Sequence, residues 1–348
     1  MVLITLVPIL LYLLILRAFD AFSLVRWRSI ALWLGWGMAS ALLVLGIVKV
    51  AHSSGHAWTS PWVSPLLEEW LKALPLLYFT VKRKVVFTAE TQLLGEAIGG
   101  GFALVENVIY FQRFHHMSVA TALVRGLGTG LMHMGCTALV ATLTLLIIQH
   151  LIQQRSSVAQ ATYSPMLTAV PSHMVFAVTP FLFVPSVALH TFHNTTSLSP
   201  MTFMVCMILV FFLAFWLVSR WGERNILRWL DVSISDDVAL IAALREGRLE
   251  ETKAGAYLTA LRDRFLPLVF FDMCVYVQLY LELLIDAKAR LMLHDAGISQ
   301  EETIEQKSDR QARLVELDAL HKRIPRLGLL LLTPLTHSTD QDRWVLRR

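Results

Sequence analysis

Long apolar runs separated by short polar stretches occupy the first two thirds of the chain. A transmembrane helix needs about 20 consecutive, mainly apolar residues. Seven runs reach or approach this length, at about 2–16, 29–51, 61–81, 91–111, 122–149, 166–193 and 201–219. The pattern predicts an all-α fold, a polytopic membrane helix bundle of about seven transmembrane helices that forms one domain over residues 1–219.

The first run is the shortest of the seven, and we expect a tilted or extended span that is retained in the protein. No basic residues precede it and no small-residue cleavage site follows it, so it lacks the marks of a signal peptide. The composition agrees with a membrane protein, because 55% of the residues are hydrophobic and only 16% are charged. An ordinary soluble domain has about 25% charged residues.

Residues 220–348 have a different composition and predict a helical domain in water. The Asp, Glu, Lys and Arg residues number 17 in residues 1–218 and 39 in residues 219–348. The stretch 266–285 is apolar enough to pass for an eighth span, but it carries Asp272, Gln278 and Glu282. Because charge inside a membrane is costly, we expect an amphipathic helix there, buried in a bundle or lying on the membrane surface.

Basic residues gather in alternate loops. They follow the first, third, fifth and seventh runs, as Arg17, Arg26, Arg28, Lys82, Arg83, Lys84, Arg155, Arg220, Arg224 and Arg228, whereas the other loops share only Arg113. The positive-inside rule therefore predicts an N-terminus outside a cell (inner) membrane and a cytoplasmic C-terminal domain. Charges that flank spans account for the net charge of +4, so we expect the lipid bilayer and no nucleic acid among the partners.

Several classes of protein are excluded by motifs that the sequence lacks. It contains no HExxH motif of a site-2 zinc protease and no GxSxG motif of a rhomboid-type serine protease. No aspartate lies inside an assigned span, which excludes a presenilin-type pair, and the seventh span has no lysine for a retinal Schiff base. The three cysteines form no CxxC pair, so neither a disulfide framework nor a zinc finger is expected.

Ionisable residues inside the spans are the candidates for chemistry, because each costs at least ~2.5–3.5 kcal/mol to insert. They are Glu68, Glu69 and Lys72 in the third span, Glu96 and Glu106 with Asn107 in the fourth, His133 in the fifth, and His173 and His190 in the sixth, which Asn194 follows. At 1.5 Å per residue, Glu68, Glu106, His133 and His190 all fall in the outer half of the membrane. We expect them to meet in one pocket that faces the exterior.

Helical spacing gives these residues local partners. Lys72 is three residues from Glu69 and four from Glu68, so it can pair with either carboxylate, and the spacing leaves open which glutamate is the base. His190 and Asn194 share a face and can both donate to an anionic oxygen. Glycines 99 to 101 are unfavourable in a helix, and predict close approach of a neighbouring helix or an extended substrate.

Structural roles compete with catalytic ones. Glu68, Glu69 and Lys72 could lock helices together, and an interior histidine such as His133 can simply be hydrogen-bonded. Glu106 and Asn107 fit a brace as well as a catalytic role. We interpret three of the remaining polar residues as structural: Glu96 as a packing residue, His173 as a local helix-break or packing residue, and Arg125 as an interfacial anchor. His193, three residues from His190, is a weaker candidate for a partner of that histidine.

Four ordered motifs on four spans resemble the PrsW family of intramembrane proteases, which is related to the CAAX prenyl endoproteases and the Abi-type membrane proteases. The first motif is Glu68-Glu69-Trp70-Leu71-Lys72, the EExxK form typical of PrsW. The others are GFALVEN from Gly101 to Asn107, then His133, then His190 with Asn194. The resemblance covers about residues 60–200 and leaves residues 220–348 without a motif.

The resemblance implies a protease that cleaves a membrane-anchored protein, such as an anti-sigma-factor-like substrate. Glu68 would activate a water together with His133, and His190 and Asn194 would stabilise the oxyanion. Glu69 and Glu106 would be required nearby, with Lys72 orienting the carboxylates. The residues themselves leave the cofactor open: none, or a zinc ion held by Glu68, His133 and His190.

Two other functions remain in competition with proteolysis. The buried charges could form the path of a proton- or ion-coupled transporter, although the spans show no inverted repeat. The chain could also be a non-catalytic scaffold or receptor that signals through residues 220–348.

Overall fold

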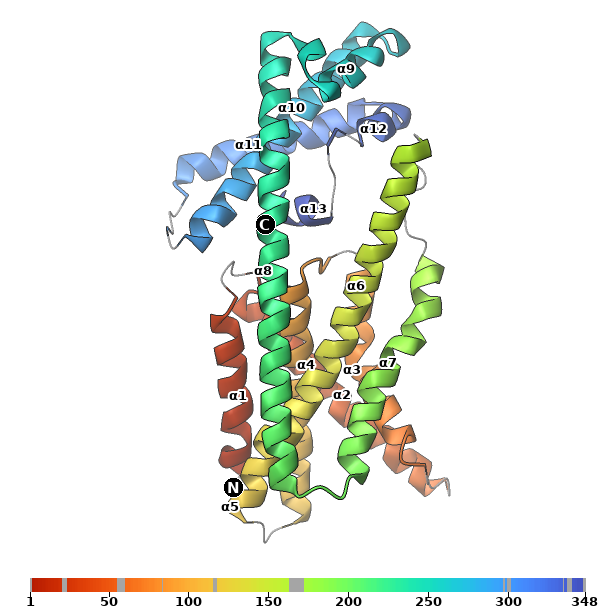
Figure 1. The fold of residues 1–348 in the computed structure, drawn as a ribbon, viewed down its shortest axis with the longest axis vertical. Coiled ribbons are helices and arrows are strands. Elements are labelled where there is room, and N and C mark those ends of the chain that lie inside the picture. Colours follow the sequence, from red (N-terminus) through yellow and green to blue (C-terminus); the bar gives the residue numbers. More distant parts are fainter. Residues whose placement is uncertain are drawn as a thin grey trace. The chain divides into compact units, whose positions relative to one another are not determined.

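Helices make up all the regular structure in the part of the chain that the structure describes (Figure 1). The computed structural model describes residues 2–20, 24–54, 60–82, 84–114, 118–162, 172–296, 298, 302–333, 335–336 and 340–346. These residues divide into two compact units, the first formed by 1–155 with 169–223 and the second by 156–168 with 224–348. The predicted boundary at residue 219 lies close to this division.

The first unit contains the long apolar helices. They are α1 (Val2–Ala18), α2 (Trp27–Ser53), α3 (Val63–Val81), α4 (Thr88–Arg113), the short α5 (Val119–Leu123) with the π-helix η1 (Val124–Thr129), α6 (Gly130–Thr162) up to residue 155, α7 (Ser172–Thr195) and the start of α8 (Pro200–Glu246). Each predicted span thus falls mainly on helical residues. Residues 166–171 of the sixth predicted span lie outside the described residues.

Among the residues that the structure describes, five helical stretches are long and apolar enough to cross a membrane: 27–53, 88–113, 119–151, 200–222 and 267–294. The helix α1 is shorter, and α3 carries three charged residues, so neither meets the same criteria. The all-α membrane bundle is confirmed. The number of seven spans and the orientation of the termini stay predictions.

Glycines let α4 pack unusually close to its neighbours. A Cβ atom added to Gly99 would lie 2.3 Å from the backbone oxygen of His133 in α6, and one added to Gly101 would lie 2.0 Å from that of Leu34 in α2. These distances are far below van der Waals contact, so only glycine fits. The expected close helix approach at glycines 99 to 101 is confirmed, and it places His133 directly against α4.

The second unit is a small helical bundle built around α10 (Pro267–Asp295). Its other elements are η3 (Leu249–Glu251), α9 (Lys253–Ala260), η4 (Arg262–Arg264), α11 (Ile304–Arg323), α12 (Arg326–Leu332), α13 (Asp340–Leu346) and the end of α8. Met273, Val277 and Leu281 of α10 are fully buried in its core. Residues 267–294 are also long and apolar enough to span a membrane, so the expectation of a helix buried in a bundle or lying on the membrane surface stays a prediction.

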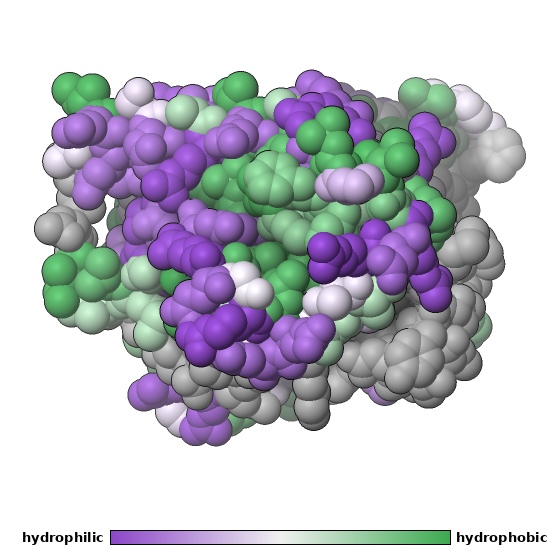
Figure 2. All heavy atoms as spheres, turned by 90° about the horizontal axis from the view of Figure 1, so that it is seen from above, coloured by the Kyte–Doolittle hydropathy of each residue, from purple (hydrophilic) through white to green (hydrophobic). Residues whose placement is uncertain are grey.

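Ion pairs and apolar surface complete this unit. Lys288 of α10 pairs with Asp342 of α13, both buried, and Asp272 accepts two hydrogen bonds from Arg323. Leu266 and Leu268, at the start of α10, are exposed. Figure 2 shows a face of the molecule on which apolar side chains are framed by hydrophilic ones.

We predict that Gly99→Ala destabilises the protein. The added methyl group forces α4 away from α6, an overpacking change that costs about 1–3 kcal/mol. The thermal unfolding temperature of the purified protein in detergent should fall. Gly46 of α2 has no atom within 4 Å of the position of a Cβ, so Gly46→Ala is the matched control and should not lower that temperature. Equal unfolding temperatures for the two variants would contradict the close packing.

Candidate functional site

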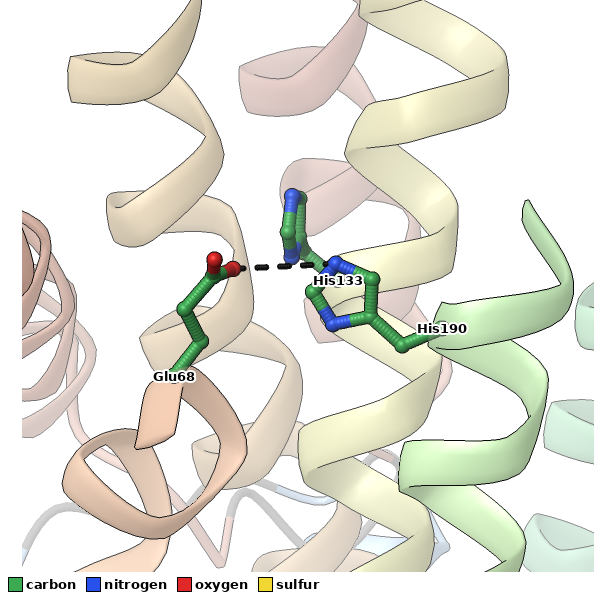
Figure 3. A group of neighbouring side chains, drawn as sticks. All are labelled: Glu68, His133 and His190. Atoms are coloured by element: carbon green, nitrogen blue, oxygen red, sulfur yellow. Dashed lines mark ion pairs between the residues drawn. The ribbon is translucent and has the colours of Figure 1, made fainter. Parts of the chain in front are cut away.

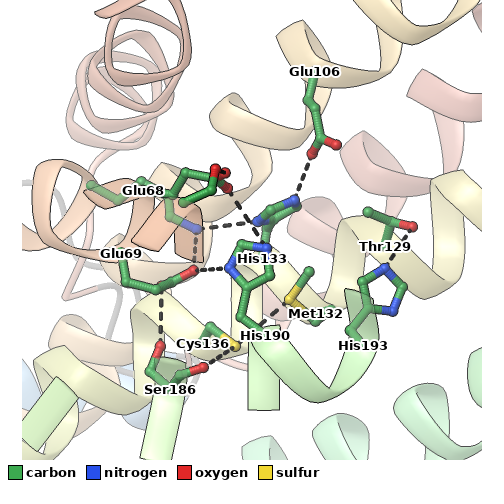
Figure 4. A network of polar contacts seen from close by, with 12 residues as sticks. Glu68, Glu69, Glu106, Thr129, Met132, His133, Cys136, Ser186, His190 and His193 are labelled. Atoms are coloured by element: carbon green, nitrogen blue, oxygen red, sulfur yellow. Dashed lines mark hydrogen bonds and ion pairs between the residues drawn. The ribbon is translucent and has the colours of Figure 1, made fainter. Parts of the chain in front are cut away.

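Polar side chains from four helices converge inside the first unit. Glu68, Glu69 and Lys72 come from α3, Glu106 from α4, His133 from α6 and His190 from α7 (Figures 3 and 4). Apolar side chains of α3, α6 and α7 form the core beside them: Ala73, Leu77, Val140, Phe183 and Val187. The structure therefore brings together six of the eight residues predicted for the site, in an apolar surrounding.

His190 contacts both glutamates of α3. Its Nδ1 lies 2.9 Å from Oε1 of Glu69, and its Nε2 lies 3.6 Å from Oε2 of Glu68. A carboxylate only accepts hydrogen bonds, so we assign the proton of the neutral ring to Nδ1, which donates to Glu69. The unprotonated Nε2 then faces Glu68.

His133 is held at both ring nitrogens. Its Nε2 lies 2.6 Å from Oε2 of Glu106, and its Nδ1 lies 3.1 Å from Nζ of Lys72. An ammonium group only donates, so Nδ1 is the acceptor and Nε2 donates to Glu106. The ring meets that of His190 edge-on, with centroids 4.8 Å apart.

Glu69 and Lys72 form a buried ion pair. Oε1 of Glu69 lies 2.5 Å from Nζ of Lys72, and both side chains are inaccessible to solvent. The Oγ of Ser186 donates to the other oxygen of Glu69 at 3.1 Å, and Nζ of Lys72 lies 4.6 Å from the centre of the Phe102 ring. Glu69 thus connects α3 to α7 through Ser186 and His190, and Lys72 connects α3 to His133 of α6.

Glu68 has a different environment from its neighbour. Its Oε1 accepts a hydrogen bond of 2.7 Å from Ser64, and 14% of its side chain is exposed. Glu106 is more open still, with 37% of its side chain exposed. The accessible side of the cluster is therefore lined by carboxylates, while the two histidines and Lys72 lie behind them.

The other predicted residues lie apart from this cluster. Asn107 is buried and accepts a hydrogen bond of 2.9 Å from Nε of Arg125. Asn194 is exposed, one helical turn beyond His190, and its side chain makes no hydrogen bond with the described residues. Glu96 is buried beside Gln92, in agreement with a structural role, and His193 contacts Thr129. The side chain of His173 lies outside what the structure describes.

The sequence analysis did not predict the polar contacts that Ser64, Ser186 and Arg125 make with the cluster. Ser186 donates to Glu69, and Arg125 donates to Glu106 through Nη2 at 3.0 Å. Ser186 was detectable, because it lies four residues before His190 and thus on the same face of one helix. Arg125 had been interpreted as an interfacial anchor, and only its contacts reveal its inward direction.

A comparison with protein-family models gives one match, to the family described as PrsW family intramembrane metalloprotease, over residues 25–218. The matched residues are more than half of the chain. The chain belongs to this family. Comparisons with curated proteins and with solved structures found no match.

The match confirms the resemblance and makes the protein a PrsW-type intramembrane protease, and thus a multi-pass membrane enzyme. It begins just before α2 and ends within α8, so it includes every residue of the polar cluster. The tail from residue 224, which folds as the second unit, lies outside the match.

The family description implies a metal, and the residues of the cluster fit one in donor type. Glu68, His133 and His190 each offer a ligand atom, and these atoms lie within 4.8 Å of one another (Figure 3). Both histidines donate their second ring N–H to a carboxylate, which is how proteins orient histidine ligands. Lys72 is the one group that a metal would have to compete with, since its ammonium lies against Nδ1 of His133.

We predict that Glu69 and Lys72 depend on each other for stability. Glu69→Gln leaves a buried ammonium group without its counter-charge, and Lys72→Met leaves a buried carboxylate. Removing one partner of a buried pair costs about 3–5 kcal/mol, whereas the double variant should recover much of that free energy of unfolding. The measurement is unfolding of the purified variants in detergent.

The control is the exposed pair Lys322–Asp318 in α11, where Lys322→Met should cost about 1 kcal/mol or less. If the double variant lost as much free energy of unfolding as the two single variants together, the charges of Glu69 and Lys72 would not neutralise each other.

Proposed function

We propose that Glu68, His133 and His190 form the hydrolytic centre of this protease, which cleaves a peptide bond of a membrane-anchored protein. The observation that carries the proposal is their convergence from α3, α6 and α7 to within 4.8 Å. Three charged or titratable groups in one apolar bundle are costly, and a purely structural lock is already supplied by Glu69 and Lys72.

Glu68 is the better candidate for the general base of the two adjacent glutamates. Glu69 is fully buried and engaged by Lys72, His190 and Ser186. Glu68 is partly exposed, and its Oε2 has only the longer contact to His190. A base must reach the water whose proton it takes, and the accessible carboxylate meets this condition.

The contacts of His133, the proposed partner of Glu68, determine which of its ring nitrogens carries the proton. With Nε2–H directed at Glu106, the lone pair of Nδ1 points to the interior of the cluster, where Lys72 lies. General acid–base catalysis of this kind contributes typically 10²–10⁴-fold to a rate. A zinc ion, when held by Glu68, His133 and His190, would polarise the substrate carbonyl and acidify a bound water.

His190 and Asn194 are the proposed stabilisers of the oxyanion; because Nδ1–H of His190 is held by Glu69, its Nε2 would donate only after it has taken the proton that Glu68 removes from the water. They lie one turn apart on α7, and the exposed carboxamide of Asn194 is not engaged by other described residues. A side-chain donor that is exposed and not engaged is available to a substrate. The tetrahedral intermediate would then lie near the end of α7, on the accessible side of Glu68.

The location of the substrate follows from the predicted orientation of the spans. Glu68 and Glu106 then lie in the outer half of the bilayer. The cleaved bond therefore belongs to a segment of the anchored protein that lies in this outer half or just outside the membrane, for example in an anti-sigma-factor-like substrate. Residues 220–348 are then cytoplasmic and regulate or recruit. The transporter alternative receives less support, because no hydrogen bond or ion pair among the described residues joins Glu96 to the cluster.

We predict that Glu68→Gln and His133→Gln each abolish cleavage, lowering the rate by about 10²–10⁴-fold. The assay compares new protein N-termini in membranes of cells that express the wild type or a variant, followed by cleavage of the identified segments by purified protein. Glu96→Gln, also a buried carboxylate of this unit but outside the cluster, is the control and should cleave normally. Full cleavage by both site variants would refute the proposal.

The same purified protein tests the metal. If a metal takes part, chelation should stop cleavage by the wild type, zinc should restore it, and elemental analysis should find metal in the wild type and less in His190→Gln. If chelation has no effect and no metal is found, the residues act on water without one.

We predict that Asn194→Ala lowers kcat about 10²–10³-fold, the usual loss of one oxyanion donor, with little change in KM or in unfolding temperature. Steady-state kinetics on an identified substrate segment measure the two constants separately. Thr195→Ala, a neighbouring change on α7, is the control. An unchanged kcat in Asn194→Ala would remove this residue from the oxyanion site.

A further inference from the structure

The backbone at Arg125 has an unusual helical geometry. It lies in the π-helix η1, which joins α5 to the helix α6 that carries His133. A π-helix has i→i+5 hydrogen bonds and a wider turn, and such turns occur frequently at functional sites. The inserted π turn changes the direction of the side chains before it relative to those after it, so the spacing between Arg125 and His133 is not that of a regular α-helix.

Glycines allow this wide turn to pack closely against α1 and α8. A Cβ atom added to Gly126 would lie 2.8 Å from the backbone oxygen of Thr5 in α1, and one added to Gly128 would lie 3.3 Å from Cβ of Met204 in α8. Close packing on two sides fixes the backbone that carries Arg125. Its direction is therefore determined by the fold and not by solvent.

The guanidinium of Arg125 has three contacts on α4. Nη2 donates to Oε1 of Glu106 at 3.0 Å, Nε donates to Oδ1 of Asn107 at 2.9 Å, and the group lies 3.7 Å from the centre of the Tyr110 ring. Only 14% of the side chain is exposed. An interfacial anchor places its charge in water, whereas this arginine directs its charge into the protein.

Glu106 links Arg125 to His133. One of its oxygens accepts from Arg125 and the other accepts from Nε2 of His133 at 2.6 Å. Because more than a third of Glu106 is exposed, this carboxylate could adopt other rotamers without a second partner. Arg125 supplies that partner, and Asn107 and Tyr110 keep the plane of the guanidinium in place.

We propose that Arg125 is a positioning residue of the hydrolytic centre, which holds Glu106 and through it the ring orientation of His133 and the hydrogen bond from its Nε2. The inference rests on the proposed function for its kinetic consequence, but its structural consequence is independent of it. Arginine suits the task better than lysine, because its planar fork reaches Glu106 and Asn107 at once.

The kinetic test compares Arg125→Gln, Arg125→Lys and Arg113→Gln on a substrate segment identified as above. Loss of an outer partner of a catalytic histidine typically costs 10–100-fold, so Arg125→Gln should lower kcat by that factor with KM little changed. Arg125→Lys should fall between it and the wild type, since a lysine retains one contact. Arg113, exposed at the end of α4, loses the same charge and should leave both constants unchanged.

A double-variant cycle tests the route through Glu106. If Arg125 acts through this carboxylate, Glu106→Gln with Arg125→Gln should be no slower than Glu106→Gln alone. Multiplied losses in the double variant would mean that Arg125 acts independently, and would overturn the inference.

A spectroscopic readout needs no substrate. In protein labelled with ¹⁵N-histidine, the His133 signals, assigned by their loss in His133→Gln, should report a proton on Nε2 in the wild type and in Arg113→Gln. In Arg125→Gln the Nε2–H proton signal should move to higher field and broaden, because its hydrogen bond to Glu106 becomes weaker and less well ordered. An unchanged Nε2–H signal together with an unchanged kcat would refute the inference.

Failure of the two proposals gives different results. If Glu68→Gln and His133→Gln retain full cleavage, the proposed hydrolytic centre is wrong, whatever Arg125 does. If those variants are inactive while Arg125→Gln keeps the wild-type kcat and the wild-type His133 signals, only the positioning role is wrong. Should Arg125→Gln not fold, the same measurements on Arg125→Lys decide, with an intermediate kcat expected.

Discussion

The buried ion pair between Glu69 and Lys72 is the interaction on which the arrangement of the site depends. It lies where no solvent reaches, so each charge needs the other, and a misplaced helix would leave both without compensation. Through the pair, α3 also contacts Ser186 and His190 on α7 and His133 on α6. Because the pair meets these structural needs, the adjacent Glu68 remains available for chemistry.

Close backbone packing sets the depth at which these groups meet. The glycines of α4 allow α2 and α6 to approach until side chains no longer separate the backbones. In a membrane, where lipid is as apolar as leucine, such contact is a main source of helix association. The position of His133 is thus set by its own backbone, which lies against Gly99, while the contacts of its ring come from α3, α4 and α7.

The sequence predicts the helices and most of the cluster because lipid imposes a strong constraint. Each ionisable residue in an apolar run is exceptional, so Glu68, His133 and His190 were evident without coordinates. The direction of Arg125 was not, because a π turn breaks the regular periodicity on which such predictions rest. The stretch around α10 was ambiguous for another reason: a helix in a protein core and a helix in lipid need similar apolar side chains.

The open side of the cluster consists of the carboxylates of Glu68 and Glu106, with the guanidinium of Arg125 balancing one of them. An approaching peptide meets this negative surface before it meets either imidazole. Aspartate or glutamate beside the bond to be cut would be repelled there, whereas neutral or basic residues would be accepted. If Glu68 is the base proposed above, the carboxylates that serve the chemistry would also select against acidic cleavage sequences.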